Sequence, residues 1–378
     1  MAGAVLERKL STSRRSGVEF SLATPTDDSE IRRLLRESAM PGRISISLER
    51  EPDYFAETRS TAGTKETIVA RERGRVVCVG NCAVRARFVN GAVRQVGYLG
   101  GLRLDSASAG RFEILRRGYD FFRELQSASP ADYYFTSIAA DNVPARRFLE
   151  RGVRGMPKYE FLGEFVTLIL PVGRAVRHGS VLEPPAGVPE ELVEFLHRGN
   201  ARYQLAPRWT VEELKGLSQL GWAGDFQVIR REGRIVACAS LWDQRSFKQS
   251  VIRGYAPGLA RWRLAHNFIA PILGSPRLPA VGAVVASAFV SHLTAVDGDP
   301  RSIVSLIARL RDVASVERPD LQMLTLGFAA NDPRLEFMRK RFRHREYRSR
   351  LYLVRWPEIG GAAEKLNPLV IAPEVALL

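Results

Sequence analysis

Two hydrophobic periods run along the chain. Alternating apolar and polar positions predict strands, and apolar positions three or four apart predict helices. In the first half they predict a strand over 18–23, a helix after 28, strands over 67–70, 76–84 and 93–104, a helix after 111, a strand over 133–138, a helix over 144–151 and a strand over 161–170. The second half predicts helices near 192–195, 303–310 and after 331, and strands over 227–229, 235–241, 284–296, 321–328 and 350–354.

The order of elements in the second half repeats that of the first. Asn142-Val143-Pro144 and Asn331-Asp332-Pro333 are each followed by apolar residues 6, 7 and 11 positions after the Asn. Turns at Gly74 and Gly233 each lie between two strand-like runs, as in a hairpin. The two turns are 159 residues apart and the two Asn motifs are 189 apart, so the second copy carries about 30 extra residues.

This repeat predicts two domains of one type. We expect a flexible basic N-terminus over 1–17, a first domain over 18–170, a second domain over 171–357 and a tail over 358–378. The boundary falls where a strand ends in Pro and Gly. The tail contains Gly-Gly, two Pro and an apolar end, which is compatible with either a loose or a docked segment.

Composition adds a basic excess to this picture. The 378 residues include 56 Lys plus Arg against 41 Asp plus Glu, a net charge of +15. Such an excess favours an anionic partner, which can be nucleic acid, an anionic membrane, an acidic carrier protein or a phosphate-rich small molecule. Three Cys and five scattered His give neither a disulfide framework nor metal-ligand spacing. Without a secretory pattern over 1–17 or a spanning apolar run, we expect a cytoplasmic protein with no membrane span and no metal.

The order of elements and one motif resemble the GNAT superfamily of acyl-CoA N-acyltransferases. The motif is Asn-x-x-Ala-x-x-Phe-Leu-x-x-Gly-Val over 142–153, which is similar to the last helical motif of that family. The resemblance covers nearly all of both halves, so the chain looks like a tandem GNAT protein. It implies an α+β (mixed α/β) fold with two GNAT-like domains, each a mostly antiparallel twisted sheet with flanking helices and splayed central strands.

The resemblance assigns an acyl-CoA site to the first half. A loop that follows a strand and opens a helix presents backbone N–H groups to a pyrophosphate. Its small residues let phosphates approach the backbone, and a strand N–H near Leu102 is expected to polarise the acyl carbonyl. The expected cofactor-binding residues are Leu102, Leu104, Ser106, Ala107, Ser108, Ala109, Gly110, Arg111, Asn142 and Phe148.

The loop departs from the family pattern, and more so in the second half. With Gly110 aligned to the first motif glycine, Ala107 takes the place of the basic or Gln residue. In the second half, 297–302 places two carboxylates and Pro300 where phosphate oxygens would lie. Asp repels phosphate and Pro has no N–H, so we expect the second domain not to bind CoA.

The general acid is left open by the sequence. Family enzymes often carry a Tyr in the last motif helix, and the matching residues here are Phe148 and Phe337, which cannot donate a proton. Tyr98 and Tyr134, on strands that border the expected site, are the candidate catalytic residues.

The expected function is transfer of an acyl group, acetyl first, from acyl-CoA to a small-molecule or peptide amine. Two alternatives stand beside it. The donor can be charged tRNA or an acyl carrier protein, which the net charge of +15 also suits. The chain can also be an inactive binding protein, because Phe148 replaces an acid. The acceptor and the oligomeric state are not readable from the sequence.

Overall fold

The computed structural model describes residues 17–57, 63–108, 110–173, 190–219, 226–270, 272, 276–356 and 364–378. Ala109, one of the expected cofactor-binding residues, lies outside this set, as do positions 1–16 of the expected basic N-terminus.

The first half folds in the predicted order with one addition. Its elements are β1 (Val18–Leu22), α1 (Asp28–Glu37), β2 (Ile44–Glu49), β3 (Thr64–Glu72), β4 (Arg75–Val89), β5 (Ala92–Leu104), α2 (Phe112–Gln126), β6 (Tyr133–Ala139), α3 (Val143–Glu150) and β7 (Lys158–Pro171). The α1 stripe of Ile31, Leu34 and Leu35 is buried, as its spacing predicts. The addition is β2, which pairs with no neighbour in sequence.

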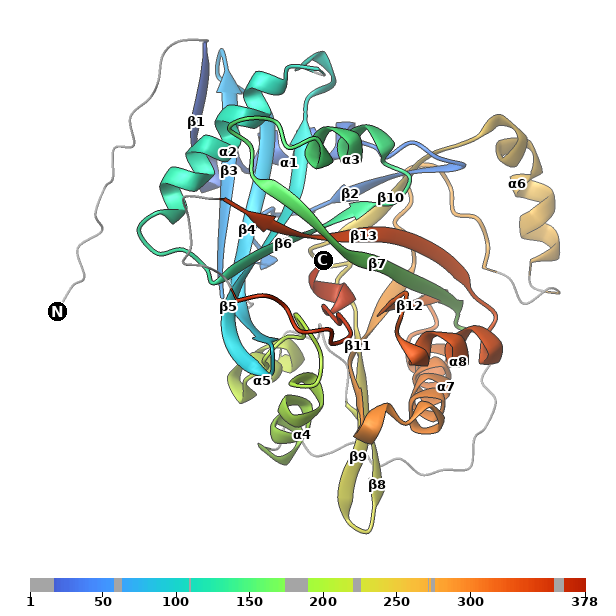
Figure 1. The fold of residues 1–378 in the computed structure, drawn as a ribbon. Helices are drawn as coiled ribbons and strands as arrows, with labels where there is room; N and C mark the ends of the chain where they lie inside the picture. The colour runs from blue at the N-terminus through green and yellow to red at the C-terminus, as the bar shows by residue number, and fades with distance from the viewer. Residues whose placement is uncertain are drawn as a thin grey trace.

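The second half repeats most of this order and inserts one strand and one helix after its hairpin. Its elements are α4 (Glu190–Asn200), α5 (Val211–Gln219), β8 (Gln227–Arg231), β9 (Arg234–Trp242), β10 (Gln249–Tyr255), α6 (Pro257–Ile269), β11 (Ser287–Ala295), α7 (Pro300–Glu317), β12 (Met323–Ala329), α8 (Pro333–Arg341) and β13 (Arg345–Arg355). The strand β10 pairs antiparallel with β2 of the first half in a separate two-stranded sheet. The helix α6 extends from this small sheet away from the body (Figure 1).

One eleven-stranded sheet joins both halves. Its order is β1-β3-β4-β5-β6-β13-β7-β12-β11-β9-β8. Two neighbouring pairs, β5 with β6 and β11 with β12, are parallel, and the other pairs are antiparallel. The expectation of a mixed α and β fold with mostly antiparallel sheet is confirmed.

The two halves exchange their last strands. The C-terminal strand β13 lies between β6 and β7, so that Ser349 is paired with Ala139 on one side and Phe165 on the other. The strand β7 in turn pairs with β12 of the second half. The sheet is therefore continuous across residue 171, and the seam is hydrogen-bonded along its length.

Each half contains a pair of parallel strands that separate. In the first half only Val96–Tyr98 pair with Tyr133–Phe135, and beyond this point β5 and β6 diverge. In the second half Ser287–Phe289 pair with Met323–Thr325 before β11 and β12 diverge in the same way. The splayed central strands expected from the resemblance are thus present twice.

Both splays are accompanied by a bulge on the longer strand. The pairing of β4 with β5 shifts between Asn81 and Val79, where Gly101 has φ +64°. The pairing of β9 with β11 shifts at the equivalent place, where His292 has φ +57°. A bulge turns a backbone N–H out of the ladder, so it exposes a hydrogen-bond donor at the opening of each splay.

The tail docks in the middle of the molecule. Gln204 forms a parallel bridge with Ile371, and Ala376 is fully buried. Leu366, Ile371 and Leu378 pack against a core cluster that includes Phe135 of β6. Of the two readings that the sequence left open for 358–378, the structure shows docking for 364–378.

Candidate active site

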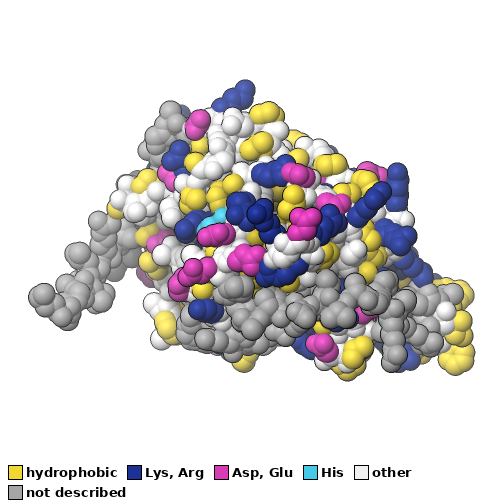
Figure 2. Space-filling view, turned by 90° about the horizontal axis from the view of Figure 1, so that it is seen from below, with side chains coloured by type: hydrophobic (Ala, Val, Ile, Leu, Met, Phe, Trp, Pro, Cys, Tyr) yellow, Lys and Arg dark blue, Asp and Glu magenta, His cyan; other side chains and the backbone are white. Residues whose placement is uncertain are grey.

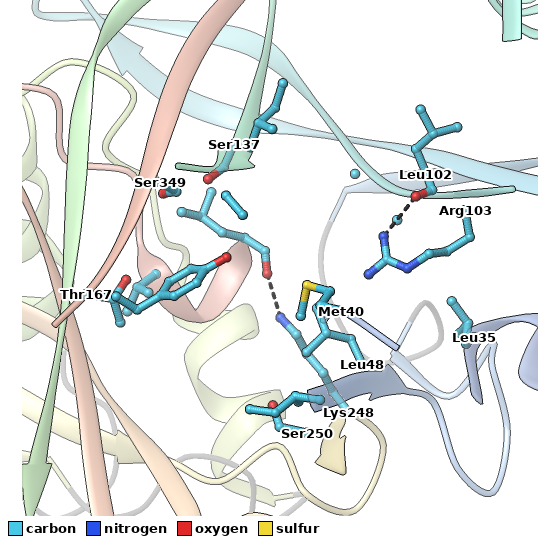
Figure 3. Close-up of a pocket in the computed structure, with 18 of the residues that line it drawn as sticks. Leu35, Met40, Leu48, Leu102, Arg103, Ser137, Thr167, Lys248, Ser250 and Ser349 are labelled. Carbon is cyan, nitrogen blue, oxygen red and sulfur yellow. Dashed lines mark hydrogen bonds between the residues drawn. The ribbon is translucent and has the colours of Figure 1, made fainter. Parts of the chain in front are cut away.

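A cavity of about 920 Å³ passes through the first splay. Its walls come from β3, β4, β5 and α2, from β6 and the start of α3, from β2, β10 and β13, from parts of β7, β11 and β12, and from the tail. Figure 3 shows Leu102 and Arg103 on one side of this space, Ser137 and Ser349 on the other, and Lys248 below. The cavity therefore has one arm on each face of the sheet, joined through the gap between β5 and β6.

The arm beneath α2 is apolar. It is lined by Phe20, Ile68, Ala70, Cys78, Gly80, Leu99, Ile114, Leu115, Gly118, Tyr119 and Phe122. The only hydrophilic atoms that these side chains offer are the Tyr119 hydroxyl, which shares a 2.5 Å hydrogen bond with Tyr159, and the Cys78 thiol. Burial raises the pKa of Cys78 to about 12, so this thiol is neutral. Such walls suit a hydrocarbon chain.

The gap itself is kept open by small residues and the bulge. An ideal Cβ on Gly101 would lie 2.3 Å from Nδ2 of Asn81, so no side chain fits there without displacing Asn81. Across the gap, Thr136 donates from its hydroxyl to the Leu99 carbonyl at 2.7 Å, which fixes the last contact before the strands part. Ser137 and Ala139 then face the cavity.

The arm on the opposite face is strongly cationic. Among the described residues that line the whole cavity, the carboxylate is Glu57 and the cations are Arg50, Lys65, Arg103, Arg245, Lys248, Arg277, Arg343 and Arg345. Glu57 accepts from Lys65 Nζ at 2.7 Å and lies 3.8 Å from Nε of Arg50. Burial alone raises the pKa of Glu57, but the charges of Lys65 and Arg50 bring it well below its ordinary value.

Lys248 lies at the floor of this arm. Its Nζ donates to the main-chain oxygen of Leu378 at 2.8 Å, and a longer contact reaches that of Ala376 at 3.4 Å. Burial, assisted by repulsion from Arg50 and Lys65, lowers the pKa of Lys248 to about 7. Near neutral pH a large share of Lys248 is therefore uncharged, whereas an ordinary lysine is almost entirely charged.

Tyr98 and Arg103 of β5 face the same arm. Tyr98 lines the cavity, whereas Tyr134, the other candidate catalytic residue, does not. Burial raises the pKa of Tyr98 to about 12, so the phenol keeps its proton. Arg103 donates to the neighbouring Leu102 carbonyl at 2.8 Å, while its buried Nε has no hydrogen-bond partner. Burial and the nearby charge of Arg50 lower the pKa of Arg103.

The structure brings some of the expected site residues together. Leu102, Asn142 and Tyr98 line the cavity. Leu104 instead packs with the cluster under α2 that contains Val77 and Ile114. Tyr134 is buried outside the cavity: its hydroxyl donates to Gln126 and accepts from the Ala131 N–H. That arrangement gives Tyr134 a packing role in the structure.

The expected pyrophosphate loop satisfies many of its own donors. The N–H of Ala107 donates to the Asp105 carboxylate at 2.9 Å, and the N–H of Ser108 donates to the Asp105 carbonyl. Arg111 forms a two-pronged ion pair with Glu72 at 2.8 and 2.9 Å. Ser106 is exposed and Gly110 faces open space at φ +82°.

The remaining expected residues lie at the start of α3. Asn142 caps this helix by accepting from the Ala145 N–H at 3.3 Å. Phe148 is stacked on the exposed Phe112 of α2, with ring centroids 4.7 Å apart. The stack bridges α2 and α3 on the face above the gap. Phe148 itself does not line the cavity among the described residues.

The second splay is filled by the tail. Glu374 Oε2 accepts from the N–H of His292, the bulge residue equivalent to Gly101, at 3.0 Å. Burial raises the pKa of Glu374 to about 6. An ideal Cβ on Gly327 of β12 would lie 2.4 Å from the Phe165 ring and 3.0 Å from Val375. Side chains of the chain itself thus occupy the gap between β11 and β12.

The helix that follows the second splay is capped internally. The Asp299 carboxylate accepts from the N–H groups of Arg301 and Ser302 at 3.1 and 3.3 Å and from the Ser302 hydroxyl at 2.6 Å. A carboxylate of the chain therefore sits where a phosphate would bind the start of α7.

Comparison with known proteins supports the fold. No family model matches the sequence, and no curated protein sequence matches it significantly. Saccharomyces cerevisiae N-myristoyltransferase with bound myristoyl-CoA is similar in structure, with a TM-score of 0.58 and 10% identity over 93% of this chain and 86% of that chain. A tandem GNAT protein from the clavulanic acid biosynthesis pathway has a TM-score of 0.53 and 13% identity over 89% and 98%.

The chain has the tandem GNAT fold. The strand order, the two splays and these solved structures agree on it. At identities of 10% and 13% these solved structures show the fold of this chain, and its activity and substrates are left to be proposed. None of the described helices is both long enough and apolar enough to cross a membrane. The described residues contain no cluster of three or more His, Cys, Asp or Glu suited to a metal ion.

Sequence reasoning missed the cationic arm. Arg50, Glu57 and Lys248 lie in segments without a family motif, and they meet only because β2 pairs with β10. One signal was available: the chain contains seven Lys, and two of them, Lys65 and Lys248, line the cavity.

Proposed function

We propose that this protein is an N-acyltransferase that binds acyl-CoA in the first splay and admits the amine acceptor from the opposite face. One observation carries this proposal: the cavity passes through the sheet between β5 and β6, whereas the equivalent gap in the second half is filled. A thioester inserted from the α2 face would meet an amine approaching over β2 and β10. The two reactants would then be held face to face, which is the main requirement of aminolysis.

The apolar arm favours an acyl group larger than acetyl. Its walls beneath α2 include Ala70, Gly80 and Gly118, and small residues leave room for a chain. The yeast N-myristoyltransferase of similar fold binds myristoyl-CoA. An acetyl group would leave most of this apolar arm without contacts, so we extend the expected donor from acetyl-CoA to medium- and long-chain acyl-CoA.

The bulge supplies the donor for the thioester oxygen. In the second half the N–H of His292 holds a carboxylate oxygen of Glu374 at 3.0 Å. The first-half equivalent is Gly101, next to Leu102, where the bulge would turn an N–H towards the gap. A carbonyl oxygen that gains negative charge during attack would be stabilised by the same kind of contact. Tyr98, protonated and in the cavity, is the candidate to protonate the departing CoA thiolate.

Lys248 is the candidate base. Since its pKa is lowered to about 7, its neutral form can take the proton that an ammonium acceptor must lose before attack. The charged groups that face it are Arg50, Glu57 and Lys65. Loss of the proton from Lys248 is complete only above pH 7, so transfer is expected to rise with pH through this value.

The test is a donor series followed by an amine screen. Acetyl-CoA, octanoyl-CoA and myristoyl-CoA are titrated against the protein by calorimetry, and each bound donor is then offered mixed amines with mass-spectrometric detection of amides. We expect one-to-one binding that tightens with chain length, and amide formation. Absence of binding for all three donors, or binding without any amide, would overturn the proposal.

A second donor is favoured by the state of the loop. Asp105 and Glu72 already engage the loop N–H groups and Arg111, which reduces what remains for the CoA pyrophosphate. An acyl carrier protein would insert only its phosphopantetheine arm and would not need that loop. Equal transfer from acyl-CoA and from acyl-phosphopantetheine would favour the carrier protein, and a large preference for acyl-CoA would exclude it.

A further inference from the structure

We propose that the acceptor is an amine that carries a carboxylate close to its nitrogen, as an amino acid does. This inference rests on the proposed function and concerns the arm that receives the acceptor. The arm is lined by Arg50, Lys65, Arg103 and Lys248, and its carboxylate among the described residues is Glu57. One side-chain carboxylate against four basic side chains leaves positive charge in the arm, which an anionic group on the substrate would offset.

Arg103 is the centre of this argument. Its guanidinium donates to the adjacent Leu102 carbonyl, and its Nε is buried without a hydrogen-bond partner. A buried guanidinium edge without an acceptor is costly, and a planar carboxylate satisfies it in the geometry that guanidinium prefers. Arg50 lies close enough to lower the pKa of Arg103, so the two cations would share one anion.

The position of the pair fits an acceptor and not the donor. Arg103 and Tyr98 face the arm opposite α2, whereas the CoA phosphates would lie at the start of α2 on the other face. A carboxylate held by Arg50 and Arg103 would leave the adjacent amine near the gap between β5 and β6. Lys248, which the proposed function gives the role of base, closes the floor of the same arm.

Matched acceptors test this proposal. Phenylalanine and 2-phenylethylamine differ by the carboxylate alone, and both are offered with the donor that binds best. We expect kcat/KM for phenylalanine to exceed that for 2-phenylethylamine by about 100-fold, and Arg103→Gln to reduce that ratio about tenfold or more. Arg198→Gln, an exposed arginine of α4, serves as the control and leaves the ratio unchanged.

Two outcomes separate this inference from the proposed function. Equal kcat/KM for the two acceptors would overturn the carboxylate site while leaving acyl transfer intact. If no amine is acylated, the proposed function fails, and binding decides the inference: N-octanoylphenylalanine must bind more tightly than N-octanoyl-2-phenylethylamine, and Arg103→Gln must abolish the difference. Equal binding of these two amides would overturn it.

A different observation carries a second proposal, for α6. This helix has its polar side chains turned towards the body and its apolar ones towards the outside. Asn267 exchanges two hydrogen bonds with the main chain of Leu278, at 2.9 and 2.7 Å, and His266 bonds to the Pro276 carbonyl. The exposed apolar side chains include Trp262 (70% exposed), Leu264 (72%) and Phe268 (83%) on the helix, and Ile272 (82%) just beyond its end. Soluble surfaces rarely gather such residues without a partner.

We infer that α6 docks on an anionic membrane surface. The helix α6 contains two Arg and no acidic residue. Arg261 is exposed on α6 beside the apolar side chains, whereas Arg263 is half-buried and donates to the Pro279 carbonyl at 3.4 Å. Aromatic and aliphatic residues that enter the acyl boundary, with Arg at headgroup level, are the pattern of helices that lie in a membrane interface. Figure 1 shows α6 projecting from the body, where a flat surface can reach it.

Vesicle sedimentation tests the docking. We expect the protein to bind vesicles of phosphatidylcholine with phosphatidylglycerol, and to bind phosphatidylcholine alone about tenfold less. The variant Trp262→Ser/Phe268→Ser should lose binding about tenfold or more, whereas Val316→Ser, at a 70% exposed position of α7, should not change it. Unchanged binding of the double variant, failure of the native protein to bind vesicles, or binding of an acidic carrier protein in place of vesicles would each overturn this second proposal.

Discussion

The two splays have nearly the same backbone and opposite contents. In each, three residues of parallel pairing precede the divergence, and a bulge with positive φ sits on the longer strand. The first gap opens into a cavity of about 920 Å³. The second holds Glu374 on the His292 N–H and Val375 against Gly327. A duplicated backbone geometry thus leaves an open gap in one half and forms a packing site for the tail in the other.

The difference lies in which carboxylates the chain supplies. Glu374 occupies the bulge of the second half, and Asp299 occupies the start of α7. Both positions in a GNAT fold are built to attract anionic oxygen, through a free N–H and through a helix terminus. When the chain provides the oxygen itself, the site no longer requires a ligand. The second half then serves the first, because it contributes β10, β13 and the tail to the cavity walls.

The largest expected effect comes from filling the first gap as the second is filled. Ser137 of β6 is equivalent to Gly327 of β12, and its side chain faces the cavity. In Ser137→Trp the indole would occupy the path of the pantetheine arm, so acyl-CoA affinity should fall about 1000-fold in a calorimetric titration. Ser305→Trp on the exposed face of α7 is the control and should bind normally. Retained affinity in a folded Ser137→Trp protein would mean that the donor does not enter by this gap.

The next prediction tests whether the second half forms a wall of the arm that receives the acceptor. Replacing Lys248 by Met removes the candidate base while keeping the size of the side chain, so kcat should fall about 100-fold. In the native protein kcat/KM should rise with pH through the lysine pKa of about 7, and this rise should vanish in the variant. An unaltered pH profile in Lys248→Met would mean that the rise of kcat/KM with pH comes from another group, such as the acceptor amine itself.

Removal of the Glu374 carboxylate should weaken the fold and spare the donor. Glu374→Ala leaves the buried N–H of His292 without an acceptor, which costs about 1–3 kcal/mol of unfolding free energy. Chemical denaturation measures this loss, and acyl-CoA titration should show one site with unchanged affinity.

The contribution of Glu374 to stability depends on pH because its pKa is raised in the folded protein. The folded-state pKa of Glu374 is raised to about 6, so the protonated form is favoured by folding, and its contribution to stability is lost as pH rises through 6. Native protein should therefore lose stability relative to Glu374→Gln between pH 4.5 and 7. A second bound acyl-CoA in Glu374→Ala would show instead that the second splay is a suppressed donor site.

The smallest effect concerns the cap of α7. Asp299→Ala removes an N-cap and should lower the unfolding free energy by about 1 kcal/mol. The equivalent loop in the first half has no such cap from its helix-preceding residue, Arg111, which is paired to Glu72. Thermal denaturation measures the loss. A new phosphate or CoA affinity in Asp299→Ala would indicate that Asp299 alone blocks the second pyrophosphate site.

Most of the fold was within reach of the sequence because its signals are local. The apolar stripe of α1, the turn at Gly74 and the repeated Asn-x-Pro starts of α3 and α8 each specify an element through residues a few positions apart. The exceptions are β2 and the exchange of β7 and β13. These depend on pairing with strands about 200 residues away, for which no local pattern exists.

The basic excess has a more dispersed placement than the sequence implied. Arg339 pairs with Glu336 and Glu346, and Arg348 with Glu346. On the face seen in Figure 2, basic and acidic side chains lie side by side in the middle of the surface. Among the described residues, eight Lys or Arg line the cavity together with one side-chain carboxylate, that of Glu57. Net charge therefore pointed to an anionic ligand, but it could not say where the charge gathers.

The sequence by itself determined the repeat, the helix and strand order and the tandem GNAT resemblance, because periodicity and caps act over a few residues. From Asp297, Asp299 and Pro300 it also predicted that the second half does not bind CoA. Only the tertiary structure decided which tyrosine faces the cavity, that the tail fills the second splay, and that Arg50, Arg103 and Lys248 meet. Each of these depends on the face to which a side chain points or on contacts between distant segments, and burial and electrostatics at that point are properties of the assembled fold.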